Sequence, residues 1–556
     1  MAATATGTKL THRQVLVVLS GLLLGMFLAA IDQTMVSTAL PVIVGDLGSL
    51  DQLSWVVTAY LLTATVSVPL WGRISDQFGR RIVFQAAIAV YLVGSILCGA
   101  AQDLNQLVAF RGLQGIGGGG LMSMAFIIIG DILSPRERGR YIGYFTATWA
   151  FASVAGPLLG GFLVDNSSWR WIFFAKVPFG IAALIVTSRV LRLPFPQRRQ
   201  RIDLIGAGLL VTAMSSLLLA ASWGGNQHPW ASSTIIGLAV GGTTLTVAFL
   251  WWEQRVDEPI VPLRLFRNPV FSVCAGLNFL IGAAMFGGIV FMPLFLQVVG
   301  GLSATASGMF MVPMMAGVTL ASIASGRLIT RTGRYKAWPV LGTGLVTVAL
   351  ALLSLLDTGV TGPQVVPIIV LMGLGVGMVM PVVTIAVQNA IDHADMGVAT
   401  SGVTFFRSLG GAIGVAGLGA VFASRLHSQL ARRLPADTLA GLDVDDVANS
   451  PEAIRALPVE IAEPVIAAVS SAVTTTFMVA APLAFVGFLV AIFLRELPLR
   501  DTAYVGAAEE EPAGLGMPAP AVAPGVATAA GRRRAARPTG VGTDGKQDPQ
   551  HPVRSH

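Results

Sequence analysis

The sequence predicts an all-α membrane protein with 14 transmembrane helices, and three observations lead to that prediction. Apolar residues make up 54% of the 556 residues and charged residues 12%, which is about half the charge of a soluble globular protein. Of the 65 charged residues, 24 lie in two segments, from Arg425 to Glu463 and from Arg500 to the end. Fourteen apolar segments remain, each with the roughly 20 residues that a helix needs to cross a bilayer.

The first apolar segment, residues 14–41, follows a short basic stretch and in this respect resembles a signal peptide. It is long enough to span a membrane and has no convincing small-residue cleavage site, so we expect a retained helix. Charged or Gly/Pro-rich interruptions bound the other thirteen segments. These cover residues 52–72, 82–101, 105–129, 141–164, 171–191, 203–222, 232–252, 271–299, 304–326, 336–356, 364–390, 397–424 and 472–494.

The basic residues orient these helices, because cytoplasmic loops of membrane proteins carry an excess of Lys and Arg. If the N-terminus is cytoplasmic, the basic clusters at 73–81, 136–140, 189–201, 255–267 and 331–336 all fall on inner loops. Arg170 is the one clear exception on a short outer loop, and the inner loop near Asp392 lacks basic residues. We therefore expect both termini in the cytoplasm. Arg outnumbers Lys 32 to 4 and Ala, Gly and Val dominate, which indicates a GC-rich bacterial genome and hence a bacterial plasma membrane.

The segments outside the spans carry fewer signals. Residues 1–13 form a short N-terminal segment, and 425–468 form a long, charged outer loop. The tail, 500–556, is rich in Ala, Pro and Gly, and we expect it to be disordered, with an arginine cluster at 532–537 that could contact anionic lipids. Cys98 and Cys274 both lie in apolar segments, which predicts packing roles and excludes a disulfide framework or a zinc site.

One loop motif occurs twice, as Gly72-Arg-Ile-Ser-Asp-Gln-Phe-Gly-Arg-Arg81 and as Gly326-Arg-Leu-Ile-Thr-Arg-Thr-Gly-Arg-Tyr335. Each copy is expected on a short cytoplasmic loop. If 200–260 is an insertion of two helices, the copies take the same place in two six-helix halves, 14–199 and 261–499. Parallel repeats of this kind are typical of secondary transporters.

The two copies are candidates for a cytoplasmic gate. Their glycines allow tight turns and close helix contact, and their arginines can bind helix ends or a carboxylate, for which Asp76 is the obvious partner. The alternative is that these charges only fix the topology. The candidate gate residues are Gly72, Arg73, Asp76, Gly79, Arg80, Gly326, Arg327, Gly333 and Arg334.

The 72–81 loop resembles the signature loop of the major facilitator superfamily, and six further segments resemble its 14-span drug:proton antiporter branch, the QacA/EmrB type. These are Asp32 to Pro41, Arg111 to Gly119, Gly156 to Gly161, Trp169 to Phe174, Pro293 to Gln297 and Phe406 to Gly414. The resemblance covers about residues 14–498 and implies two six-helix halves plus two inserted helices. It implies an exporter but identifies no substrate.

Two ionisable residues are expected at similar depth inside the membrane, where a charge is costly and therefore indicates function. Asp32 lies about 17 residues into the first span, roughly 26 Å along the helix, and Arg111 about seven residues, roughly 10 Å, into the fourth span from the outside. Burial favours a protonated carboxyl and a nearby cation favours the charged form, so a proton and a cationic substrate can compete for Asp32. The resemblance implies the same role for Asp32 and a part in proton coupling for Arg111. Alternatively, Asp32 only forms hydrogen bonds within the first helix.

Three further features lie inside predicted spans. Gly156, Pro157, Gly160 and Gly161 form a small-residue face for helix packing, a motif that marks exporters in the resembled family, although Ala152 replaces its usual glycine.

Arg407 is expected to be buried and to need an acceptor, either backbone carbonyls or a coupling partner. Lys176 stands where the resembled pattern has Asn; it could be an extra cation inside the sixth span, or could reach the outer surface, which is the simpler interpretation.

Methionine and phenylalanine side chains are concentrated in the ninth and tenth spans. Thioethers and aromatic faces suit a cavity that accepts differently shaped apolar cations, but packing is the more common role. The candidate cavity residues are Met285, Phe291, Met292, Met309 and Phe310.

We therefore predict a proton-coupled exporter of amphipathic, cationic drugs or toxic compounds that acts as a monomer among membrane lipids, with no cofactor and no nucleic-acid partner. The alternatives are a dedicated exporter of one metabolite, antibiotic or lipid, or a membrane sensor or enzyme without transport. The aqueous loops contain no HExxH, GxSxG or Walker motif, which disfavours an enzyme and ATP coupling.

Overall fold

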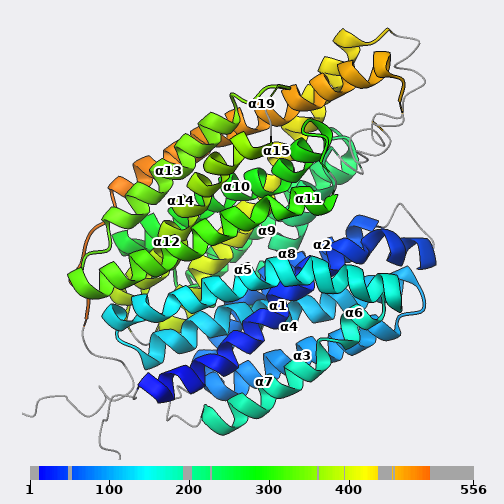
Figure 1. Ribbon diagram of the computed structural model, residues 1–556. Coiled ribbons are helices and arrows are strands. Elements are labelled where there is room, and N and C mark those ends of the chain that lie inside the picture. Colours follow the sequence, from blue (N-terminus) through cyan, green and yellow to red (C-terminus); the bar gives the residue numbers. More distant parts are fainter. Residues whose placement is uncertain are drawn as a thin grey trace, which may run out of the picture. The chain divides into compact units, whose positions relative to one another are not determined.

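The computed structural model describes residues 12–47, 53–191, 203–225, 228–302, 304–359, 362–392, 395–435, 454 and 457–500, all within one compact unit, Met1–Glu510. The first helix group, drawn in blue to cyan in Figure 1, consists of α1 (His12–Leu47), α2 (Leu53–Phe78), α3 (Arg80–Ala100), α4 (Leu104–Ile132), α5 (Pro135–Asn166), α6 (Trp171–Phe174) and α7 (Val177–Val190).

Two further helices, α8 (Leu204–Trp223) and α9 (Ser233–Glu253), and a short 3-10 helix, η2 (Leu263–Arg267), lead to the second helix group. This group consists of α10 (Pro269–Val298), α11 (Ala304–Met309), α12 (Met311–Thr332), α13 (Ala337–Leu353), α14 (Gly362–Ala390), α15 (Met396–Arg433) and α19 (Val459–Ile492).

The predicted all-α membrane fold is confirmed. The described part of the chain contains thirteen spans long and apolar enough to cross a membrane, and the shorter apolar helix α13 stands at the eleventh predicted position. The sixth predicted span is interrupted, because α6 ends at Phe174 and α7 begins at Val177. The tenth predicted span, 304–326, likewise consists of two helices, since α11 ends at Met309 and α12 begins at Met311. Every predicted segment thus coincides with a helix or with one of these two interrupted pairs.

Helix ends differ from the predicted boundaries where polar residues continue a helix beyond its apolar part. Helix α15 runs to Arg433 and α19 begins at Val459, so both ends of the predicted outer loop, 425–468, are helical. Residues 436–453 of that loop lie outside the described residues, as do residues 1–11 and the predicted disordered tail after 500.

The two copies of the repeated motif are helical over most of their length, which corrects the expectation of loops. Residues 72–78 belong to α2, and Gly79 alone separates α2 from α3 with a φ of 88°. In the second copy, residues 326–332 belong to α12, and Gly333 ends that helix with a φ of 70°. A positive φ strongly favours glycine, so each copy needs its second glycine at a helix end, although ψ is 147° at Gly79 and 3° at Gly333.

Side-chain caps fix several helix starts. Asp103 accepts a hydrogen bond from Gln106 N at α4, and Asp203 and Ser232 accept from Gly206 N and Ile235 N at α8 and α9. At α5, Ser134 precedes Pro135; its hydroxyl accepts a hydrogen bond from Glu137 N at 3.4 Å and donates one to the Glu137 carboxylate at 3.0 Å. These caps satisfy backbone N–H groups that would otherwise lack partners at the helix starts.

The two helix groups meet through a few helices. Helix α5 packs along α12 and α14, and α2 and α4 pack against α15. In Figure 1 the cyan α5 accordingly lies beside the green helices of the second group. The α8–α9 pair contacts α2 and α15 through α8, so it adjoins both groups.

The end of α1 near Asp46 is tied to the turn before α6. The Asp46 carboxylate accepts hydrogen bonds from the Trp169 indole at 2.8 Å and from the Arg170 guanidinium at 3.1 Å. These bonds, the Trp169 bond first, hold the pKa of Asp46 below its usual range. Arg170, the exception to the charge pattern of the outer loops, thus has a local carboxylate partner.

Candidate functional site

Four side chains form a buried polar cluster in the first helix group, which we call the charge cluster: Asp32, Arg111, Gln114 and Lys176. Asp32 of α1 is fully buried, and its Oδ2 accepts a hydrogen bond from Arg111 Nη1 at 2.6 Å. Its Oδ1 accepts one from Gln114 Nε2 at 3.1 Å and forms an ion pair with Lys176 Nζ. Both carboxylate oxygens therefore have charged partners.

Arg111 and Gln114, one turn apart on α4, hold each other in place. Gln114 Oε1 accepts a hydrogen bond from Arg111 Nη1 at 2.8 Å, and Arg111 Nε donates to the Val56 carbonyl at 3.1 Å. The guanidinium carbon lies 4.3 Å from the centre of the Tyr60 ring, in a cation–π contact. Cys98, predicted as a packing residue, also touches this network, because its thiol lies 3.7 Å from Gln114 Oε1.

Lys176 reaches Asp32 because the sixth span is interrupted at that point. It lies between α6 and α7, directly before the turn that contains Pro178, which has no N–H to continue the α6 ladder. Its side chain is only 2% exposed, and its Nζ lies 4.7 Å from the centre of the Phe173 ring. The interpretation that Lys176 reaches the outer surface is therefore wrong, because its side chain is buried and points to Asp32.

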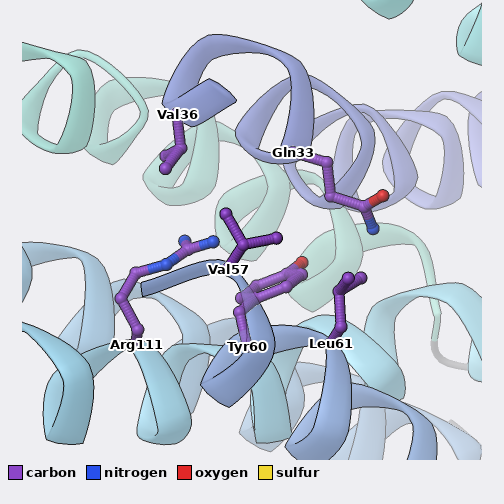
Figure 2. A pocket seen from close by; sticks show the side chains of 6 residues that line it. All are labelled: Gln33, Val36, Val57, Tyr60, Leu61 and Arg111. Carbon is purple, nitrogen blue, oxygen red and sulfur yellow. The ribbon is translucent and has the colours of Figure 1, made fainter. Parts of the chain in front are cut away.

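A cavity of about 140 Å³ adjoins the charge cluster (Figure 2). It is lined by residues of α1, α2 and α4, namely Gln33, Val36, Val57, Tyr60, Leu61 and Arg111. Figure 2 shows the Arg111 guanidinium extending toward Val57 from one side and the Gln33 amide above Leu61 on the other. The cavity thus combines aliphatic walls with the edge of the cluster, which suits an amphipathic ligand.

At one end of the bundle the helix groups touch through the first glycine of each repeat. A Cβ on Gly72 of α2 would collide with Ser401 and the Gly397 carbonyl of α15. A Cβ on Gly326 of α12 would collide with the Gly139 carbonyl of α5. The two copies therefore make equivalent contacts, each with a helix of the other group, and we call this end the closed end.

Charges at the closed end are paired mainly in the first copy. Arg80 is buried and donates to Asp76 at 2.5 Å, to Ser75 at 2.6 Å and to Asp131 of α4 at 2.6 Å. The predicted Asp76 partner is therefore present, and Asp131 is a second carboxylate partner that was not predicted. In the second copy Thr330 replaces the aspartate, and Arg327 and Arg334 are exposed.

Polar contacts between the groups add to this closure. Arg138 of α5 is buried; it donates to Gln388 of α14 at 3.0 Å and to the carbonyls of Leu133 and Gly130. Gln388 in turn donates to the Phe126 carbonyl at 2.9 Å. Further along α5, the Thr146 and Ser322 hydroxyl oxygens lie 2.9 Å apart.

The small-residue motif on α5 packs against α1 close to Asp32. A Cβ on Gly156 would collide with the Thr34 hydroxyl, and that hydroxyl donates to the Ala152 carbonyl at 3.1 Å. Gly160 is also buried, whereas Pro157 is exposed and Gly161 has open space beside it. Only part of the predicted face thus makes a tight contact.

Arg407 and the methionine-rich group lie away from the charge cluster. Arg407, on α15, is partly exposed and forms no hydrogen bond or ion pair within the described residues, so the predicted acceptor is not found among them and its coupling role stays a prediction. Met285, Phe291 and Met292 are buried in a hydrophobic core with α14, α15 and α19, and Phe310 packs against that core. Met309 is 67% exposed. None of the five lines the cavity beside Arg111, and their role in a substrate cavity stays a prediction.

The structure therefore brings together Asp32 and Arg111, as predicted from their depth, and adds Lys176 and Gln114. Gln114 follows Arg111 by three positions, so it shares a helix face with it, which is the signal that could have identified it. Asp131 and Gln388 depend on contacts between distant helices and have no comparable local signal.

Comparisons with known proteins agree with this architecture. Residues 22–415 match the sequence model of the Major Facilitator Superfamily. The chain is 40% identical to the "Multidrug transporter protein MdtP" of Bacillus subtilis, over 75% of this chain and 77% of that protein. It is 33% identical to "Multidrug resistance protein 3" of the same species, over 87% of this chain and 96% of that protein. The fold is similar to the crystal structure of the human organic anion transporter MFSD10, with a TM-score of 0.59 and 15% identity over 85% of this chain and 99% of that one.

Proposed function

The chain belongs to the major facilitator superfamily, and from that premise we propose that it is a proton-coupled antiporter that exports amphipathic small molecules across the bacterial plasma membrane. Efflux of drugs is supported by the multidrug transporters to which the chain is similar over most of its length. Proton coupling and exchange are the further steps of the proposal.

The observation that carries these steps is the ion pair of Asp32 with Arg111 at 2.6 Å, fully buried beside a cavity of amphipathic character. Ionisable groups in a membrane interior are costly and therefore indicate a function such as transport, and a buried carboxylate whose charge is balanced by cations responds to the arrival of a proton or a ligand. The charge cluster and the cavity share Arg111, so binding in the cavity can alter the pairing of Asp32.

The closed end supports alternating access between the two helix groups. In the predicted topology, residues 72–80 and 326–334 face the cytoplasm, so this conformation is closed on the cytoplasmic side. Glycine contacts between α2 and α15 and between α5 and α12 provide two equivalent seams that can separate as the groups rock. The buried Arg80 with its two aspartates then acts as the charged part of the gate.

The membrane potential can drive such an exchange when the cargo is neutral, whereas exchange of one proton for a monovalent cation moves no net charge and is driven by the pH gradient. One proton that moves down a potential of 100 mV releases about 2.3 kcal/mol. At about 1.4 kcal/mol per tenfold concentration ratio, this sustains a gradient of some fiftyfold for a neutral cargo.

The proposal is tested by expressing the wild-type chain and Asp32→Asn in a bacterial host without its own efflux pumps, and by measuring ethidium accumulation. Wild-type cells should accumulate less ethidium than empty-vector cells, and a protonophore should abolish the difference. Asp32→Asn should accumulate as much as the vector control, with its membrane expression verified by immunoblotting. Equal accumulation in all three strains would overturn broad-specificity export.

A further inference from the structure

One residue of the charge cluster is not needed for the Asp32–Arg111 pair. Lys176 stands where the resembled antiporter pattern has an uncharged Asn, yet it is buried and forms an ion pair with Asp32. We infer that Lys176 is the group that carries the exchanged proton in this protein, so that its ammonium competes with the cationic cargo for the charge cluster. This inference rests on the proposed function, since it assigns the proton of that exchange to a side chain.

The charges of the cluster indicate which group exchanges the proton. With all three groups ionised, Asp32 contributes one negative charge and Arg111 and Lys176 two positive charges, so the cluster carries a net charge of +1. Protonation of Asp32 would raise that to +2, in an interior that stabilises net charge poorly. Loss of a proton from Lys176 instead leaves a neutral Asp32–Arg111 pair.

Side-chain chemistry leads to the same residue. Arginine stays protonated in proteins, whereas a buried lysine can lose its proton. Asp32 accepts three donor groups, from Arg111, Gln114 and Lys176, and this arrangement favours its charged form. The charged form of Lys176 is stabilised less. Among the described residues, Asp32 is the one carboxylate that pairs with its ammonium, and the other close contact is the Phe173 ring.

The groups that face Lys176 come from each helix packed around it. Asp32 lies on α1, Arg111 and Gln114 lie on α4, and Cys98 on α3 lies within electrostatic range. The phenols of Tyr60 and Tyr91 stand beside Asp32 and are neutral at physiological pH; the Tyr91 hydroxyl donates to the Leu28 carbonyl at 2.8 Å. Asp32 is therefore the only anion in this group at neutral pH, and it has to be shared between two cations.

The exchange step then follows directly. A cationic cargo enters beside Arg111, the Nζ–H bond of the Lys176 ammonium breaks, and its proton passes to water while the electron pair stays on the nitrogen. The positive charge of the cargo replaces that of the ammonium, and the net charge of the cluster is unchanged. On the opposite side of the membrane a proton binds Nζ and expels the cargo, which is antiport by competition for one net charge.

The test measures proton release by the purified full chain in a weakly buffered detergent solution when ethidium, a permanent cation, is added. We expect the wild type to release about one proton for each ethidium bound, and to bind ethidium at least tenfold more tightly at pH 8.5 than at pH 6. Lys176→Met should bind ethidium with the same affinity at both pH values and release no proton. Lys176→Asn, which restores the residue of the resembled pattern, is a second neutral variant should the methionine variant fail to fold.

Two further variants make the result specific to this side chain. Lys336→Met changes the other lysine of the described residues in the same way and should release protons like the wild type. Lys176→Arg keeps a permanent positive charge and should bind ethidium weakly at both pH values. Proton release that persists in Lys176→Met or Lys176→Asn would assign the proton to Asp32 and overturn this inference, while the proposed antiport would stand. Wild-type protein that binds ethidium without releasing a proton would overturn the proposed coupling itself.

Discussion

At the scale of single residues, the sequence could locate the pair of charges but not its surroundings. The rise of a helix is fixed at about 1.5 Å per residue, so counting along two spans placed Asp32 and Arg111 at one depth, and the structure has them in contact at 2.6 Å. The position of Lys176 depends on how the interrupted sixth span turns, and counting residues cannot supply that. The same limit applies to Arg407, whose exposure depends on the space beside α15 and not on its depth.

Gln114 should matter for the charge cluster although it carries no charge. Gln114→Leu removes a donor to Asp32 and an acceptor for Arg111, and leaves both charges buried with one partner fewer. We expect a loss of about 1–3 kcal/mol, seen as a lower melting temperature, together with slower ethidium efflux. Cys98→Ala is the matched control, since it removes only the weak thiol contact to the Gln114 amide oxygen. Equal effects of the two variants would show that the amide only fills space.

At the scale of helices, the repeated motif was recognised from its spacing, and its glycines have the conformations that explain the spacing. Gly79 and Gly333 both adopt a positive φ at a helix end, and Gly72 and Gly326, seven residues earlier, both touch a helix of the other group. The sequence could not indicate that six of the intervening residues stay helical, because a polar helix end and a loop have the same composition. It also could not identify Asp131, because its contact with Arg80 joins residues 51 positions apart.

The contact at Gly326 is predicted to be essential for closure. In Gly326→Ala the new methyl group would lie inside the van der Waals radius of the Gly139 carbonyl, so α12 and α5 must separate. We expect a lower melting temperature, equivalent to about 1–3 kcal/mol, and loss of most ethidium efflux. Gly237→Ala on α9 is the control, because a Cβ there has no neighbour within 4 Å and alanine favours a helix. If both variants kept wild-type efflux, the close approach of α5 and α12 would not be required for transport.

At the scale of the whole molecule, the two helix groups are joined at seams that run along α5 and α12 and along α2 and α15. The α5 seam begins at Gly139 and Gly326, continues at Gly143 beside Ile323, and reaches Thr146 beside Ser322, about 10 Å along the helix. Apart from Ile323, the residues at these positions are small and allow close packing with little interlocking of side chains, which favours a contact that can open. The repeat in the sequence predicted two related halves, but the packing of α5 against α12 could not be predicted from it and is seen only in the folded chain.

Locking this seam should stop transport if the two groups move against each other. Thr146 and Ser322 have hydroxyl oxygens 2.9 Å apart, so cysteines at both positions are within reach of a disulfide, and the native Cys98 and Cys274 are buried. Oxidation of Thr146→Cys/Ser322→Cys should reduce ethidium efflux to the empty-vector level, and dithiothreitol should restore it. Thr58→Cys/Ser222→Cys, built on a 3.4 Å contact, joins α2 to α8 and leaves the α5–α12 seam free to open, so its oxidation should preserve efflux. Transport that continues with the first pair fully cross-linked would mean that the cargo leaves without separation of α5 from α12, and would rule out alternating access by rocking of the two groups.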